Sequence, residues 1–183
     1  MFYLLSKLIV IKILGWKVVG SFTKLPKVVV AVYPHTSNYD FALAIMIRTY
    51  IKEEINYVGK KELFNPLTAW FFKGLGGAPL NRKGNQNIVE GIVDVYKSKQ
   101  KFRLAIAPEG TRNLVDEWKT GFYYIAKGAE VPIQLVGFDY PKREVVFYPL
   151  FTPTDNIEAD FKAMKSSFKG VKGKNPDKSI LIT

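Results

Sequence analysis

Short, β-branched apolar runs alternate along the chain with stretches of helical periodicity. Runs such as KVVVAVY and VPIQLVGF are the length of strands, and they are almost entirely apolar, as strands buried on both faces are. They predict strands at 27–33, 55–59, 103–107 and 131–138, with a late strand at 144–151. Helical patterns follow or lie between them at 38–52, 63–75, 85–99, 120–127 and 161–169.

This alternation predicts an α/β fold: a single domain with a largely parallel mixed sheet flanked by helices, preceded by an amphipathic N-terminal helix. A chain of 183 residues with 48% hydrophobic content is long enough for one sizeable core and too short for two typical domains. We expect a membrane-associating segment at 1–17, the main domain at 18–168 and a flexible basic tail at 169–183. Ligands of such a sheet bind at the carboxyl ends of its strands.

The first 17 residues are apolar but carry Lys7, Lys12 and Lys17, so no run approaches the ~20 apolar residues that a spanning helix needs. Two interpretations remain open. The lysines could reach anionic headgroups while the apolar face lies at the acyl boundary, or the same face could pack on the sheet of the domain. The apolar positions that share this face are Phe2, Leu5, Ile9, Ile13 and Trp16.

Charge and composition restrict the possible partners and chemistry. The 27 Lys and Arg against 16 Asp and Glu give a net charge of +11, which favours nucleic acid, an anionic lipid surface or a phosphorylated substrate. The chain has no cysteine and one histidine, which excludes thiolate catalysis and cysteine zinc sites and leaves little for a histidine metal site. Phosphate-loop, dinucleotide and serine-hydrolase signatures are absent.

The single histidine, His35, follows the first predicted strand, and Asp40 comes five positions later. On one continuous helix the two would point about 140° apart, so they can pair only if His35 lies in the turn before the helix. Asp40 would then fix the imidazole tautomer and leave the other ring nitrogen to accept a proton. Taken alone, this spacing favours structural roles for both residues: His35 would form hydrogen bonds to the backbone, and Asp40 would interact favourably with the helix dipole at the start of the helix.

Three further groups of polar residues offer possible phosphate ligands. APEGTR places Glu109, Gly110, Thr111 and Arg112 after the strand at 103–107, where the arginine could donate two hydrogen bonds to a phosphate. GGAPLNR ends at Arg82, a second phosphate donor. Lys60 lies just after the strand at 55–59. Each group alone is as compatible with a solvated surface turn.

Four blocks of the sequence, taken in chain order, resemble the motifs of the lysophospholipid acyltransferase family, typified by 1-acylglycerol-3-phosphate O-acyltransferases. His35 to Asp40 matches its H-x-x-x-x-D block, and Gly76 to Arg82 matches its glycine-rich block ending in arginine. Pro108 to Arg112 matches P-E-G-T-R, and the V-P-I run at 131–133 matches the fourth block. The resemblance covers most of the domain, from about Val28 to Tyr140.

The resemblance implies roles for the matched residues. His35 would be the general base and Asp40 its orienting partner, while Arg82, Arg112 and Lys60 would bind the acceptor phosphate. Glu109, Gly110 and Thr111 would shape the acceptor site. The implied reaction transfers an acyl group from acyl-CoA or acyl-carrier protein to a lysophospholipid hydroxyl, most simply that of 1-acylglycerol 3-phosphate, giving phosphatidic acid. It implies no metal and no bound cofactor.

Partners and location follow as expectations. The basic surface would favour an anionic membrane, and the absence of a signal-peptide pattern predicts a bacterial enzyme held peripherally at the cytoplasmic face of the cell membrane. Two alternatives stay open. The same chemistry could act on glycerol 3-phosphate or a lyso form of an amino-acid lipid, or the chain could be a noncatalytic basic module for membrane or nucleic acid; with the acyltransferase assignment we expect no nucleic-acid partner.

Overall fold

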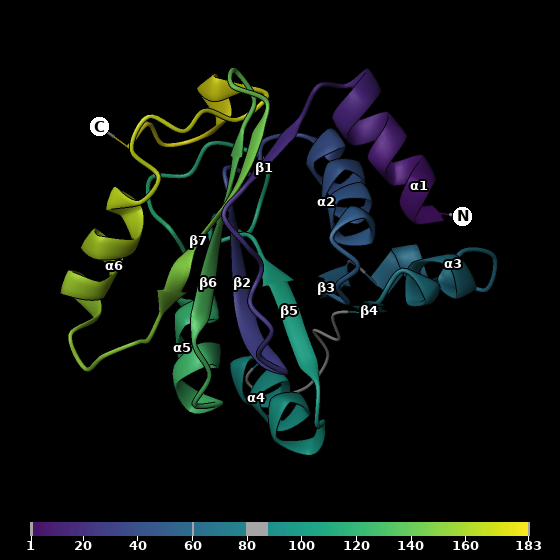
Figure 1. Cartoon of the computed structure of the whole chain (residues 1–183). Coiled ribbons are helices and arrows are strands. Elements are labelled where there is room, and N and C mark those ends of the chain that lie inside the picture. Colours follow the sequence, from purple (N-terminus) through teal and green to yellow (C-terminus); the bar gives the residue numbers. More distant parts are fainter. Residues whose placement is uncertain (1, 60, 80–87, 183) are drawn as a thin grey trace.

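A computed structural model describes residues 2–59, 61–79 and 88–182. Its core is a mixed sheet in the order β1-β7-β6-β2-β5-β3-β4 (Figure 1). β7 runs antiparallel to β6, and every other neighbouring pair is parallel. The strands are β1 (Lys17–Val19), β2 (Lys27–Tyr33), β3 (Asn56–Gly59), β4 (Gly77–Pro79), β5 (Phe102–Ile106), β6 (Ile133–Asp139) and β7 (Glu144–Phe151).

Helices connect the strands and cover both faces of the sheet, which confirms the predicted α/β class. The α-helices are α1 (Phe2–Lys7), α2 (Asn38–Tyr50), α3 (Ala69–Gly74), α4 (Ile88–Ser98), α5 (Gly121–Gly128) and α6 (Ile157–Ser166). Three short helical segments of other types are the π-helix η1 (Leu8–Ile13) and the 3₁₀ turns η2 (Lys61–Phe64) and η3 (Pro176–Lys178).

The predicted helix at 63–75 is wrong in extent, because the chain forms η2 and then α3 with a turn between them. Asn65 precedes Pro66, and a residue before proline is disfavoured in helical conformation. The Asn65 side chain instead accepts hydrogen bonds from the backbone N–H groups of Leu67 and Thr68. The strands β1 and β4, of three residues each, are too short to show a periodic pattern and were not predicted.

Alternating residues of β2 divide the core into two layers. Val29, Ala31 and Tyr33 belong to a cluster that includes buried side chains of α4, α5 and α6. Val28 and Val30 belong to the opposite cluster, which includes Val10 of η1 and Leu43 and Ile47 of α2. Side chains alternate across a strand, so a fully apolar strand can serve both layers.

The N-terminal segment divides its apolar residues between the core and the surface. Val10 is fully buried, while Phe2, Leu4 and Leu8 are at least half exposed. Of the five residues predicted to share one apolar face, Ile9 is half-buried and Trp16 is buried. Trp16 lies beyond the end of η1, just before β1, so it does not continue the helical face. Among the described residues, no helix is long and apolar enough to cross a bilayer.

The C-terminal segment, residues 169–182, packs on the domain although its composition predicts a loose tail. Val171 is buried next to Phe168, and the backbone N–H of Gly170 donates to the carbonyl of Ile182. The carbonyl of Lys172 accepts a hydrogen bond from the backbone N–H of Tyr140, in the turn between β6 and β7. Figure 1 shows this segment, in yellow, passing beside that turn.

Candidate active site

The turn between β2 and α2 places His35 and Asp40 together. Ser37 caps α2: its hydroxyl accepts from the backbone N–H of Tyr39, and the Asp40 carboxylate accepts from the N–H of Ser37. This reciprocal capping bends the chain so that Nδ1 of His35 lies 3.3 Å from Oδ2 of Asp40. The imidazole is 25% exposed and the carboxylate 1%, so the histidine can meet a substrate and the aspartate cannot.

Four donors surround the Asp40 carboxylate. Oδ2 accepts from the N–H groups of Thr36 and Ser37, each at 2.8 Å, and lies beside His35. Oδ1 accepts from the hydroxyl of Tyr140 at 2.6 Å. Burial alone would raise the pKa of Asp40, but the hydrogen bonds from His35, Tyr140 and Ser37 outweigh it and hold the pKa below its usual value. The carboxylate is therefore ionised and can stabilise an imidazolium.

Glu109, at the end of β5, reaches the same turn from the other side. Its Oε2 accepts a hydrogen bond of 2.7 Å from the backbone N–H of His35. Its Oε1 is buried and has no hydrogen-bond partner among the described residues. Burial, with the nearby charge of Asp40, raises the pKa of Glu109 to about 7 despite the His35 hydrogen bond. With 1% of its surface exposed, Glu109 holds the histidine turn from within.

The rest of the APEGTR turn faces solvent. Gly110 adopts φ +65°, a left-handed conformation that glycine accepts without a steric penalty, and the Lys119 side chain lies over it. The Thr111 hydroxyl accepts from the N–H of Asn113. Arg112 is exposed and forms no ion pair with any described residue. It is therefore free to meet an anion, as is typical of a phosphate-binding arginine.

The structure brings together only some of the predicted site residues. His35, Asp40 and Glu109 meet directly, and Gly110 to Arg112 continue from Glu109 into solvent. Lys60 and Arg82 lie outside the described residues. No group of three or more potential metal-ligating side chains of His, Cys, Asp or Glu occurs within the described ranges.

Two residues of the site were missed by sequence reasoning. Tyr140 donates a hydrogen bond to Asp40 from 100 positions away in the sequence, and no motif next to β6 marks it. Asn175 holds the histidine turn from the C-terminal segment: its backbone N–H donates to the Thr36 hydroxyl and its side-chain amide to the Thr36 carbonyl, at 3.2 and 2.9 Å. No signal near either residue marks it, because both contacts depend on the complete fold.

The structure combines an α/β domain with a solvent-accessible histidine and a buried aspartate at the carboxyl end of a central strand, and the sequence contains no cysteine that could act as a nucleophile. The sequence matches the family described as Acyltransferase over residues 18–139. The chain therefore belongs to the Acyltransferase family. As such it is an enzyme of lipid biosynthesis that uses an acyl donor and a lipid acceptor.

A solved structure supports the same fold. The chain is similar to the 1-acyl-sn-glycerophosphate (LPA) acyltransferase PlsC from Thermotoga maritima, with a TM-score of 0.61. The two share 18% sequence identity, and the similarity covers 91% of this chain and 74% of that one. Among curated proteins, no sequence matches this chain.

Proposed function

We propose that the protein transfers a fatty acyl group from acyl-CoA or acyl-carrier protein to the free hydroxyl of 1-acylglycerol 3-phosphate, with His35 as general base. The observation that carries this proposal is the pair formed by the accessible His35 imidazole and the buried, ionised Asp40 at 3.3 Å. The acceptor is the one named for the Thermotoga protein of similar fold.

In the proposed mechanism, Asp40 accepts from Nδ1–H of His35 and so leaves Nε2 unprotonated. Nε2 removes the proton from the acceptor hydroxyl as its oxygen attacks the thioester carbonyl. The C–S bond then breaks, the ester forms, and the departing thiolate takes the proton back from the imidazolium. Asp40 stabilises that imidazolium through the buried ion pair, and Glu109 holds the His35 backbone in place.

Phosphate recognition is assigned by the same proposal to Arg112, whose exposed guanidinium follows the Glu109 turn. Lys60 and Arg82 remain candidates from the sequence. Gly110 and Thr111 shape the turn that presents Arg112, and Glu109 acts as a positioning residue instead of touching the substrate.

The reaction is tested by thiol release from acyl-CoA in detergent, with and without 1-acylglycerol 3-phosphate. We expect acceptor-dependent release by the native protein and a fall of about 10³-fold or more in His35→Gln, since the base is lost. Lys178→Gln, on the exposed C-terminal segment, is the control and should keep the native rate. A native rate in His35→Gln would refute the base assignment.

A panel of acceptors sharpens the substrate assignment. Glycerol 3-phosphate and a lyso amino-acid lipid would be compared with 1-acylglycerol 3-phosphate at equal concentration, using acyl-CoA and acyl-carrier protein donors in turn. We expect the highest kcat/KM with 1-acylglycerol 3-phosphate. A higher value for another acceptor would move the assignment to it, and absence of transfer to every acceptor would favour the noncatalytic membrane module.

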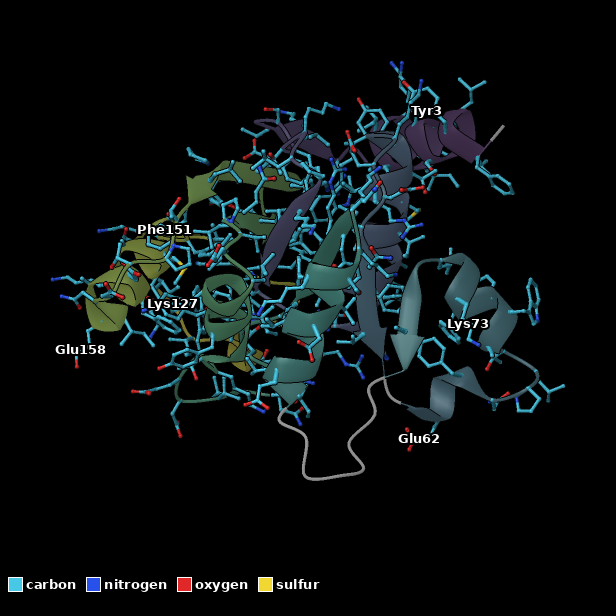
Figure 2. All side chains as sticks on the ribbon, turned by 90° about the horizontal axis from the view of Figure 1, so that it is seen from below. Tyr3, Glu62, Lys73, Lys127, Phe151 and Glu158 are labelled. Carbon is cyan, nitrogen blue, oxygen red and sulfur yellow. The ribbon has the colours of Figure 1, made fainter. Side chains whose placement is uncertain are left out.

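Peripheral attachment to the cytoplasmic face of the cell membrane is part of the proposal. Phe2, Leu4 and Leu8 expose apolar side chains on the N-terminal helices, and Leu67 and Trp70 do so just before and within α3. α1 and α3 lie on the same side of the molecule in Figures 1 and 2. Lysines of the same segments, such as Lys73 of α3, suit the headgroup region of an anionic bilayer.

Sedimentation with anionic phospholipid vesicles tests this attachment. The double variant Leu4→Ser, Leu8→Ser should bind vesicles at least tenfold more weakly, because each leucine contributes on the order of 1 kcal/mol or more when buried in the acyl region. Leu181→Ser changes a similarly exposed leucine of the C-terminal segment and should bind as the native protein does. If the double variant bound vesicles as tightly as Leu181→Ser, the proposed attachment would be contradicted.

A further inference from the structure

A pocket of about 340 Å³ lies beside the candidate dyad and is formed by three segments that are distant in sequence. The end of the N-terminal helices supplies an apolar wall, the turn between β6 and β7 supplies an aromatic ring and a cation, and the C-terminal segment supplies a second cation. The lining residues are Ile13, Leu14, Trp16, Tyr140, Arg143 and Lys174.

Tyr140 connects this pocket to the site. Its ring forms part of the pocket wall and packs edge-on against Trp16, with ring centroids 4.9 Å apart. Its hydroxyl donates to Oδ1 of Asp40 at 2.6 Å. One side chain therefore contacts both the pocket and the carboxylate that pairs with His35, which places the pocket immediately behind the dyad.

Lys174 is held close to the same turn. Its ammonium lies 3.1 Å from the ring centroid of Tyr39, the residue before Asp40. The next residue, Asn175, is bonded to Thr36 through both its backbone and its side chain. These contacts fix the position of the C-terminal segment, so the lysine is presented at the pocket and not on a free tail.

The pocket is cationic and has no acidic lining residue among those that the structure describes. Arg143 uses one N–H to donate to the carbonyl of Leu14 at 3.2 Å, which leaves most of its donors available. Neither Arg143 nor Lys174 forms an ion pair with any residue of the described ranges. Two uncompensated cations at one pocket attract an anion with several acceptor oxygens.

The remaining lining of the pocket is largely apolar. Ile13 and Leu14 are exposed, and Trp16 is buried except for a small part of its surface. A pocket lined by two cations and by aliphatic and aromatic carbon suits an amphiphile that joins a phosphate to a less polar chain. Arg112 belongs to a different loop, after β5, and is not among the lining residues.

We propose that Arg143 and Lys174 form a second phosphate-binding subsite, which holds the phosphate of one of the two reactants while the attached chain lies against Ile13, Leu14 and Trp16. This inference rests on the proposed acyl transfer, in which the acceptor and the acyl-CoA donor both carry phosphate. The shared chemistry is a phosphate ester attached to a chain. Which reactant provides it is decided by the two arms of the experiment.

Isothermal titration calorimetry of the full chain with two probes provides the test: free coenzyme A, and lysophosphatidic acid below its micelle-forming concentration. Arg143→Gln and Lys174→Gln should each raise the Kd of one probe about tenfold, since each removes a charge-assisted contact. Monoacylglycerol, which has the chain without the phosphate, should bind the variants as it binds the native protein.

Two control variants make the same charge change outside the pocket. Lys142 lies in the same turn as Arg143 and pairs with Asp139 at 3.1 Å, and Lys178 lies on the same segment as Lys174. Lys142→Gln and Lys178→Gln should change each Kd by less than about twofold. Arg143→Lys keeps the charge and should retain most of the affinity.

The outcomes separate this subsite from the proposed reaction. Loss of coenzyme A affinity alone assigns the subsite to the donor, and loss of lysophosphatidic acid affinity alone assigns it to the acceptor. Three results would overturn the subsite. The native protein and both glutamine variants could have equal affinities, or the controls could lose as much affinity as the variants. Arg143→Lys could also lose as much affinity as Arg143→Gln. Selective loss of binding in a protein that transfers no acyl group would keep the subsite and reject the reaction.

Discussion

The first turn of α2 and the loop after β5 each place one buried carboxylate against the same histidine turn, but the two carboxylates have opposite pKa shifts. Asp40 and Glu109 are each 1% exposed, so burial does not distinguish them. The pKa of Asp40 lies below its usual value, while that of Glu109 is raised to about 7. The difference follows from the number of donors that each carboxylate receives.

Asp40 receives hydrogen bonds on both oxygens, from backbone N–H groups, a tyrosine hydroxyl and the imidazole. Glu109 receives one, from the His35 backbone, and its second oxygen has no partner among the described residues. Each donor stabilises the charged form and burial opposes it. An Asp40 whose pKa is lowered and a Glu109 whose pKa is raised to about 7 therefore lie against the same histidine turn.

The largest effect should come from removing the charge of Asp40. The asparagine amide in Asp40→Asn would keep an acceptor oxygen for the Thr36 and Ser37 N–H groups, so the variant should fold while leaving the imidazolium without its counter-ion. We expect kcat to fall on the order of 10³–10⁴-fold, as when the aspartate of other His–Asp pairs is replaced. Steady-state thiol release measures this. A kcat within about tenfold of native would mean that the Asp40 charge does not support His35 as the base.

The second largest effect should be a change in the pH dependence of stability in Glu109→Gln. The folded-state pKa of Glu109, about 7, lies above the value of 4.5 expected when unfolded. Its protonated form is therefore favoured by folding, and the stability that it contributes is complete below pH 4.5 and declines as pH rises to about 7. The glutamine should abolish this decline, which amounts to about 3 kcal/mol in the free energy of unfolding.

Urea unfolding at pH 5 and pH 8 checks the Glu109 prediction. The native protein and Glu109→Gln should differ little at pH 5, and the variant should be the more stable at pH 8. Glu158→Gln, on the first turn of α6, is a control that should follow the native pH profile. Parallel profiles for Glu109→Gln and the native protein would show that Glu109 is not protonated near neutral pH.

A smaller effect should follow from removing one donor of Asp40. Tyr140→Phe deletes the hydroxyl that bonds Oδ1 and keeps the ring against Trp16. We expect a loss of about 2 kcal/mol in the free energy of unfolding at pH 7, the usual contribution of a hydrogen bond to a charged group. The pKa of Asp40 should move toward its usual value. Tyr124→Phe, at a half-exposed position of α5, should leave stability unchanged.

The smallest effect should arise in the turn that presents Arg112. Gly110→Ala places a Cβ at φ +65°, which costs about 1 kcal/mol in the free energy of unfolding. The added Cβ also meets the flexible Lys119 side chain, which can move aside. Gly91→Ala lies in α4 with open space around it and should instead stabilise by up to about 1 kcal/mol. Thermal unfolding of the pair measures the difference in sign.

The longer strands and the order of the helices could be predicted from local sequence patterns, since β2 and β7 coincide with the apolar runs that predict them. The short strands β1 and β4 and the break at Pro66 did not, because three residues carry too little periodicity and the turn depends on Asn65. The His35 to Asp40 pairing was foreseeable from the capping pattern. The contacts to Glu109, Tyr140 and Asn175 were not, because they span 74, 100 and 139 positions.

Asp40 starts helix α2 and also completes the pair with His35. This double role has an evolutionary consequence. In a homologue that no longer catalyses the reaction, replacing Asp40 would still remove the cap of α2 and destabilise the fold. Replacing the partly exposed His35 would cost the fold little. Among homologues that have lost catalytic activity, we therefore expect the histidine to be replaced first and the aspartate to be retained for capping.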